Sequence, residues 1–289
     1  MRHIIPTKLN GKRCILVSGK KITTIETMDI TIIGAGKLAT NLGVELKEKG
    51  FHIKEIFSRT ERSANRLAEL LNCSKTTSFE QINKDSDLYI IALKDDAFLE
   101  ALPKICNERK DAIFLHTSGS LLMSSFAPYA NRFGVLYPMQ TFSIDKLLSF
   151  SDIPIFIDAN NEDTLNTIKS IATSISKKVY HLNDTDRKYL HIAAIFACNF
   201  SNYCYSVAQE LLENRSIPFE VILPLIDETA KKVHKMSAIE AQTGPAARKD
   251  TKVIESHIQL LESNKALQSL YKEMSSQIIN KLEQHNDND

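Results

Sequence analysis

Small residues spaced to approach a phosphate follow the first strongly apolar run of the chain. The run Ile30–Ile33 leads into Gly34, Gly36 and Ala39, which form a G-x-G-x-x-A pattern before an amphipathic segment. In this pattern the first glycine permits a tight turn, the second lets the backbone approach a pyrophosphate, and the small third residue lets a helix pack on a strand. The N–H groups that begin the helix, and its dipole, favour negative charge. The pattern predicts a dinucleotide site whose phosphate-binding residues are Gly34, Ala35, Gly36, Lys37 and Leu38.

A second extended run, residues 52–57, ends in Ser58, Arg59 and Thr60, with Arg62 just beyond. Enzymes that use NAD usually have Asp or Glu at this point for the ribose hydroxyls, and a carboxylate would repel a 2′-phosphate. A guanidinium can bind that phosphate and stack on adenine. We therefore expect NADP(H) rather than NAD(H), bound in part by Ser58, Arg59 and Thr60. The alternative is that Arg59 and Arg62 are ordinary solvated residues at the start of a helix.

Three later loops follow predicted strands and are expected to complete the site. In an open parallel sheet, ligands lie beyond the carboxyl ends of the strands. Leu93 and Lys94 follow the apolar run 87–93 and are placed to contact the ribose and phosphates. The hydroxyl-rich segment 116–120 suits a nicotinamide contact at Thr117 and a substrate contact at Ser118, although a turn with self-satisfied hydroxyls is an equal alternative. Gln140, after the run 134–137, is a further candidate for substrate binding.

A helical segment beyond residue 184 has polar side chains on an otherwise apolar stretch. Arg187, His191, Asn199 and Asn202 follow one another at steps of four, eight and three, so at α-helical spacing they share one face with Ile195. We interpret His191 as a proton donor, because an imidazole supplies a proton near neutral pH, with the two asparagines as further catalytic residues that orient substrate and Arg187 as a substrate ligand. The alternative is a hydrogen-bonded interface between domains or subunits.

A helix break in the segment 243–250, TGPAARKD, contains one more candidate. Arg248 follows Gly244-Pro245, and an arginine fixed at such a break could bind a substrate carboxylate in bidentate fashion. The alternative is a structural contact between Arg248 and Asp250 that caps the next helix.

These residues require two kinds of domain. Strand and helix patterns alternate from Met28 to residue 183, with helices expected at 62–71, 97–106 and 162–176. Only helix patterns follow, at 184–213, 218–236, 253–261 and 264–284. The chain is therefore expected to form an α/β domain at 28–183, a Rossmann-like doubly wound parallel sheet, followed by an all-α substrate and dimerisation domain at 184–289.

Residues 1–27 are basic and polar, with short apolar bursts and no continuous apolar core of a signal peptide. One interpretation is an extension that is dispensable for function and arises from a start codon upstream of Met28. The other is a small appended hairpin in which residues 14–18 pair with residues 22–25.

Composition excludes several classes of protein. The 289 residues have a net charge of +1, which gives no general attraction to nucleic acid or anionic lipid. No apolar run approaches the roughly 20 residues of a membrane span. The five cysteines are scattered and include no C-x-x-C pair, so we expect a reducing compartment, the cytoplasm, and neither disulfides nor a metal site.

Several longer segments together resemble one family. The segments GAGKLA, LKDDA, HTSGS, YPMQTF, RKYLHIAAIFACNF and TGPAARKD resemble those of a bacterial family of Rossmann-like NADP oxidoreductases. That family is similar in architecture to pyrroline-5-carboxylate reductase, ketopantoate reductase and the 6-phosphogluconate dehydrogenase group. The resemblance extends from Met28 to about Lys281 and implies an NADP-binding first domain, a helical second domain and a homodimer formed through its helices.

The chain departs from the better-known hydroxyacid dehydrogenases at one point. Their catalytic Lys and Asn lie one helical turn apart, whereas the matching spacing here contains Arg187 and His191, and Lys188 points to a different face. Lysine catalysis of that type is therefore not expected.

The leading hypothesis is an NADP(H)-dependent oxidoreductase that transfers a hydride to or from a small C=O or C=N substrate that bears a carboxylate. A second hypothesis is a noncatalytic NADP-binding sensor or interaction protein, because a fold does not fix a function. A third is the binding of another nucleotide, such as a deazaflavin-linked cofactor.

Overall fold

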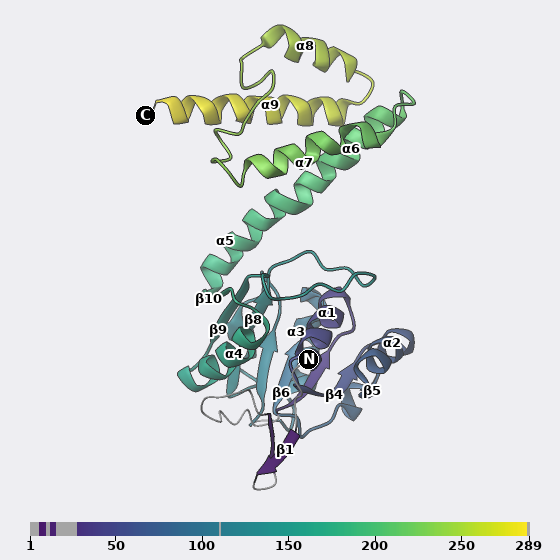
Figure 1. Cartoon of the computed structure of the whole chain (residues 1–289), viewed down its shortest axis with the longest axis vertical. Coiled ribbons are helices and arrows are strands. Elements are labelled where there is room, and N and C mark those ends of the chain that lie inside the picture. Colours follow the sequence, from purple (N-terminus) through teal and green to yellow (C-terminus); the bar gives the residue numbers. More distant parts are fainter. Residues whose placement is uncertain (1–5, 10–11, 16–27, 110, 288–289) are drawn as a thin grey trace. The chain divides into compact units, whose positions relative to one another are not determined.

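The computed structural model of the chain describes residues 6–9, 12–15, 28–109 and 111–287. Within it the chain forms two compact units, Met1–Asn199 and Phe200–Asp289. Figure 1 shows the first unit as a sheet with helices and the second as helices alone. The predicted fold class is therefore confirmed, while the predicted domain boundary near residue 183 stays a prediction.

The first unit contains an eight-stranded sheet in the order β10-β9-β8-β7-β6-β3-β4-β5. Neighbouring strands are parallel except for the antiparallel pair β8–β9. The strands are β3 (Asp29–Ile33), β4 (His52–Phe57), β5 (Ser74–Thr76), β6 (Leu88–Ile91), β7 (Ile113–His116), β8 (Arg132–Pro138), β9 (Ile155–Ala159) and β10 (Val179–His181). Their β-branched and aromatic runs suit a sheet that is buried on both faces.

Side chains of successive strand residues enter two separate cores, one on each face of the sheet. In β3, Ile30 and Ile32 belong to one core and Ile33 to the other. The first core also contains apolar side chains of α1 (Lys37–Glu48), α2 (Glu61–Leu71) and α4 (Glu162–Ile175). The second contains those of α3 (Asp95–Cys106) and of the 3₁₀ turn Met123–Phe126. Helical layers on both faces make the sheet doubly wound.

The direction of winding reverses at β3, which lies between β4 and β6. The chain first adds β4 and β5 on one side, then crosses to add β6, β7 and β8 on the other. Ligands of open α/β sheets bind beyond the carboxyl ends of the strands at such a reversal. The glycine turn follows β3 and the loop 92–94 follows β6, so both lie at this position.

One long helical stretch leads from the first unit into the second. It consists of α5 (Asp184–Ala194), a π-helical segment (Ile195–Phe200) and α6 (Ser201–Glu213). The second unit continues with the 3₁₀ turn Phe219–Ile222, α7 (Leu223–Lys232), α8 (Thr251–Leu260) and α9 (Lys265–Asn286). Among the described residues of this unit, only Ala246 and Ser275 are buried.

Before Met28 the described backbone forms a hairpin in which β1 (Pro6–Leu9) pairs with β2 (Lys12–Ile15). The hairpin suggested by the sequence used residues 22–25 as its second strand, and these lie outside the described residues.

Candidate functional site

The first glycine of the fingerprint sits where no other residue fits. Gly34 has a φ of +119°, and its N–H donates a 2.8 Å hydrogen bond to the Phe57 carbonyl. A Cβ at this position would lie 2.5 Å from the Ala92 carbonyl oxygen and 3.6 Å from Cδ2 of Leu93. The turn therefore depends on both the positive φ and the absence of a side chain, and it holds the end of β3 against the loop after β6.

The second glycine of the fingerprint faces open space. Gly36 precedes α1 without a side-chain cap, and a Cβ built on it meets no atom within 4 Å. The N–H groups of the first helical turn have no intrahelical acceptor, so they are available to a ligand. Ala39, the third small residue, is buried in the core, as the fingerprint requires where helix and strand pack. Gly36 and Lys37 are exposed and Leu38 is half-buried.

Arg66, which the sequence patterns did not predict as a site residue, touches the glycine turn. Nη2 of Arg66, in α2, donates a 2.7 Å hydrogen bond to the Ala35 carbonyl and a long 3.4 Å one to the Thr40 hydroxyl. Thr40 in turn donates to the Gly36 carbonyl at 2.9 Å. The signal that could have identified Arg66 is its i+4 spacing from Arg62 on a helix that returns past the turn.

The loop after β4 and the start of α2 expose two arginines. Ser58 is buried and its N–H donates to the Thr76 carbonyl at 3.2 Å, whereas Arg59, Thr60 and Arg62 are exposed. Within the described part of the chain, neither Arg59 nor Arg62 forms an ion pair or a side-chain hydrogen bond. The one acidic residue of this loop region, Glu61, is paired with Lys75.

The loops after β6 and β7 lie at the same edge of the sheet. Lys94 is exposed just before α3, while Thr117 is buried with its hydroxyl 3.5 Å from the Ile91 carbonyl. The Ser118 hydroxyl accepts hydrogen bonds from the N–H groups of Ser120 and Leu121, at 3.1 and 3.2 Å. These bonds match the self-satisfied turn given above as the alternative for this segment.

Gln140 follows β8 and is exposed, and its side-chain oxygen accepts a 2.8 Å hydrogen bond from the N–H of Thr141. The loop that begins here is fixed to α1 by Asn41. The Asn41 amide donates to the Ser143 carbonyl at 2.7 Å and accepts from the Leu148 N–H at 3.0 Å. The strand ends thus place Gln140 at the same edge as the glycine turn.

His191 is held between a tyrosine and a glycine of the first unit. Its Nδ1 lies 3.2 Å from the Tyr137 hydroxyl, and the two rings meet edge to face at 74°. On another side, a Cβ added to Gly119 would lie only 2.7 Å from Nδ1. Tyr137 belongs to β8 and Gly119 to the loop after β7, so the imidazole lies at the carboxyl edge of the sheet.

Arg187, one turn before His191, is fully buried. Its Nη2 donates to the Leu121 carbonyl and, at 2.7 Å, to Asp184, whereas Nε and Nη1 are buried and have no hydrogen-bond partner among the described residues. His116 at the end of β7 is also fully buried, and its Nε2 has no partner in the described part of the chain. Burial, and secondarily the charge of Arg187, lowers the pKa of His116 to about 3, so this imidazole is neutral.

The helical face predicted for the other polar residues is interrupted. The π-helical segment Ile195–Phe200 follows α5, which contains His191, and it includes Asn199 and precedes Asn202. Because π-helical bonds run from i to i+5, steps counted at 3.6 residues per turn do not carry across it. Asn199 and Asn202 are exposed, and Asn202 belongs to the second unit.

Arg248 is an exposed residue of the second unit, and its N–H donates to the Gly244 carbonyl at 3.3 Å. The Asp250 side chain caps α8 by accepting a 3.3 Å hydrogen bond from the Val253 N–H. Asp250 therefore caps the next helix, as the alternative interpretation of this segment expected, but the cap does not involve the Arg248 guanidinium.

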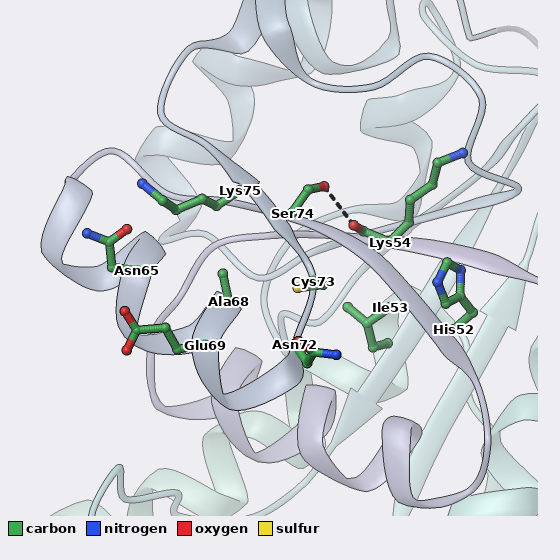
Figure 2. A pocket seen from close by; sticks show the side chains of 10 residues that line it. All are labelled: His52, Ile53, Lys54, Asn65, Ala68, Glu69, Asn72, Cys73, Ser74 and Lys75. Carbon is green, nitrogen blue, oxygen red and sulfur yellow. Dashed lines mark hydrogen bonds between the residues drawn. The ribbon is translucent and has the colours of Figure 1, made fainter.

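A surface pocket of about 530 Å³ lies elsewhere on the first unit. Figure 2 shows it between α2 and the amino ends of β4 and β5, lined by side chains such as His52, Asn65 and Asn72. The Ser74 hydroxyl donates to the Lys54 carbonyl at its rim. This is the opposite edge of the sheet from the glycine turn, and no predicted site residue lines the pocket.

The described residues contain no group of three or more His, Cys, Asp or Glu side chains that could hold a metal ion. None of the helices in the described part of the chain combines the length and apolarity needed to cross a bilayer.

Comparisons with known proteins agree with this geometry. Residues 29–118 match the family model described as NADP oxidoreductase coenzyme F420-dependent, and residues 153–278 match a domain of unknown function, DUF2520. The crystal structure of a proposed NADP oxidoreductase from Bacteroides fragilis is 44% identical, with a TM-score of 0.84 over 88% of this chain and 98% of that one. No curated protein matches the chain significantly.

More distant structures share the fold. A protein of Thermotoga maritima has a TM-score of 0.68 at 23% identity, covering 89% of this chain and 99% of its own. An imine reductase from Myxococcus stipitatus in complex with NADP+ has a TM-score of 0.63 at 14% identity, covering 88% of this chain and 94% of its own. A 1-pyrroline-5-carboxylate reductase from Streptococcus pyogenes has a TM-score of 0.58 at 14% identity, covering 88% of this chain and 98% of its own. The glycine turn, the doubly wound sheet and the match to the Bacteroides protein over nearly its whole length show that this chain belongs to the Rossmann-like NADP oxidoreductase family.

Proposed function

We propose that the protein is an NADP(H)-dependent oxidoreductase acting on a small C=O or C=N compound that bears a carboxylate. The observation that carries this proposal is the shared position of two features. An open, uncapped helix start at Gly36 and an imidazole, His191, fixed by Tyr137 both lie at the carboxyl ends of strands that run parallel in one sheet. The first suits a pyrophosphate and the second a proton transfer.

The residues present fit a nicotinamide dinucleotide. A Cβ on Gly36 would meet no atom within 4 Å, which leaves the backbone open to a pyrophosphate, and Arg66 adds positive charge at the turn. Arg59 and Arg62 are available for a 2′-phosphate, since the neighbouring carboxylate of Glu61 is engaged by Lys75. These features favour NADP(H) over NAD(H).

The roles in the reaction divide between cofactor and protein. When bound, the nicotinamide supplies or accepts the hydride. In the reducing direction, His191 as imidazolium releases its proton to the substrate oxygen or nitrogen, which balances the hydride gained by carbon. Ser118, Gln140, Arg187 and Arg248 remain the proposed substrate ligands, and Asn199 and Asn202 the proposed orienting groups. The imine reductase and the pyrroline-5-carboxylate reductase of this fold support a C=N substrate.

The test is NADPH oxidation across a panel of cyclic imines and 2-oxo acids, for the wild type and His191→Ala. We expect His191→Ala to bind NADPH normally and to lose at least about 100-fold in kcat, the usual size of a general acid's contribution. Unchanged turnover would remove His191 from its role. Tight NADPH binding without oxidation of any compound would favour the noncatalytic sensor.

The protein is further proposed to act as a homodimer in a reducing compartment such as the cytoplasm. Helices α6, α7 and α8 bury no residue within the chain, and large apolar side chains such as Tyr203, Leu225 and Leu260 are exposed. A helical unit with so little buried surface needs a partner to cover it. Size-exclusion chromatography with light scattering should give about twice the chain mass, and a monomer would contradict the dimer.

A further inference from the structure

The proposed function uses Tyr137 only to fix His191, and Tyr137 is the described residue that hydrogen-bonds the His191 ring. Its hydroxyl oxygen lies 3.2 Å from Nδ1, within hydrogen-bonding distance for an O···N pair. The tyrosine is only 8% exposed, and its ring is packed against Phe156 at 6.3 Å between centroids. The hydroxyl is therefore held in place by a buried ring on a central strand.

The Tyr137 hydroxyl remains a neutral phenol under ordinary conditions. Burial raises the pKa of Tyr137, and the positive charge of Arg187 opposes this only in part. A neutral hydroxyl can accept a hydrogen bond from an N–H of either a charged or an uncharged imidazole. It can therefore contact Nδ1 before and after His191 gives up a proton.

The backbone of Gly119 packs against the His191 side chain. A Cβ at Gly119 would lie 2.7 Å from Nδ1, 2.8 Å from Cγ and 3.0 Å from Cβ of His191. Because Gly119 has no side chain, the backbone of the loop after β7 packs directly on the imidazole. Nε2 makes no hydrogen bond within the described residues, so it is the ring nitrogen left for a proton exchange.

We propose that Tyr137 is a positioning residue whose hydroxyl accepts the Nδ1–H of His191 and thereby makes Nε2 the atom that exchanges the proton with substrate. This inference rests on the proposed role of His191. An imidazolium that releases its proton from Nε2 is left with its remaining proton on Nδ1, and the Tyr137 oxygen stabilises that form. The tyrosine acts through the histidine and needs no contact with substrate.

The proposed hydrogen bond predicts one tautomer of the neutral His191 ring. With Tyr137 in place, neutral His191 has a proton on Nδ1 and a lone pair on Nε2. Without the hydroxyl, nothing among the described residues holds that tautomer. Which nitrogen is protonated is set by the hydrogen bond that the other makes, so loss of the hydroxyl changes the tautomer.

The test is ¹⁵N NMR of histidine-labelled protein at about pH 8.5, well above the ordinary histidine pKa of about 6.5. The His191 signals are assigned by their absence in His191→Gln. The wild type is compared with Tyr137→Phe, which keeps the buried ring, and with Tyr189→Phe as a matched control. Tyr189 is 72% exposed and lies two residues before His191 on the same helix.

We expect the wild type and Tyr189→Phe to show a protonated Nδ1, and Tyr137→Phe to shift toward a protonated Nε2. With an imine or oxo acid that the wild type reduces, Tyr137→Phe should lower kcat about 10-fold or more with unchanged NADPH affinity. Identical ring signals in the wild type and Tyr137→Phe, or a shifted tautomer with unchanged kcat, would overturn the inference. Normal turnover of His191→Ala is a separate result, since it would overturn the proposed proton donor whatever the NMR signals show.

Discussion

The guanidinium of Arg66 donates a 2.7 Å hydrogen bond to the backbone carbonyl of Ala35, and so α2 is tied to the middle of the glycine turn. The same nitrogen lies 3.4 Å from Thr40, whose hydroxyl bonds the Gly36 carbonyl. A half-buried cation thus supports the turn from the side of the second helix. Because it lies beside the proposed pyrophosphate site, we expect Arg66 to have both a structural and an electrostatic effect on a bound dinucleotide.

Arg66→Met should weaken NADPH and NADH to a similar extent, by about 5- to 20-fold, because it removes a turn support and a charge common to both nucleotides. Arg62→Met, in the same helix but without a described partner, is the matched control and should affect NADPH more than NADH. Isothermal titration calorimetry measures the affinity of each of the two variants for NADPH and for NADH. Equal behaviour of the two variants would show that Arg66 has no distinct role at the turn.

The two fingerprint glycines should respond differently to a methyl group. Gly34→Ala places a Cβ 2.5 Å from the Ala92 carbonyl at a φ of +119°, so we expect a loss of roughly 2–4 kcal/mol in the free energy of unfolding. Gly36→Ala meets nothing within 4 Å and should unfold like the wild type, yet bind NADPH at least about tenfold more weakly. Urea unfolding and nucleotide titration separate the two effects. Unimpaired binding by Gly36→Ala would argue against a pyrophosphate at that position.

The buried His116 makes the stability depend on pH. Burial in the folded protein lowers the pKa of His116 to about 3, against an ordinary value of 6.5. Between these values the unfolded chain binds the extra proton, so the stabilisation present above pH 6.5 is lost as the pH falls. Between pH 7 and pH 5 the free energy of unfolding of the wild type should fall by about 2 kcal/mol more than that of His116→Phe.

Urea unfolding of both proteins at several pH values checks this, with His234→Gln as the control because His234 is exposed. The control should follow the wild type. Parallel curves for wild type and His116→Phe would show that the imidazole is not kept neutral by the fold.

Much of the fold could be predicted from the sequence because its signals are local. The run Ile30–Ile33, the turn at Gly34 and the alternation up to residue 183 predict a doubly wound sheet, and the structure confirms it. The antiparallel direction of β9 relative to β8 carries no local signal, since an apolar run reads the same in either direction.

The site could be predicted only in part, because its contacts join residues distant in the chain. Arg66 reaches Ala35 across 31 residues and Tyr137 reaches His191 across 54, and no spacing rule connects such pairs. The face shared by His191 and Asn199 was counted at α-helical spacing, which the π-helical segment Ile195–Phe200 interrupts. Whether these residues act together in the reaction stays a prediction.

The most direct test of the central claim is a fluorescence titration of NADPH and NADH against the wild type, Arg59→Ala and Gly36→Ala. The account predicts that the wild type binds NADPH at least about tenfold more tightly than NADH, a difference of roughly 1.4 kcal/mol. Arg59→Ala should remove that preference, and Gly36→Ala should weaken both nucleotides. Failure of the wild type to bind either nucleotide would contradict the assignment of the glycine turn as a dinucleotide site, and with it the proposed oxidoreductase.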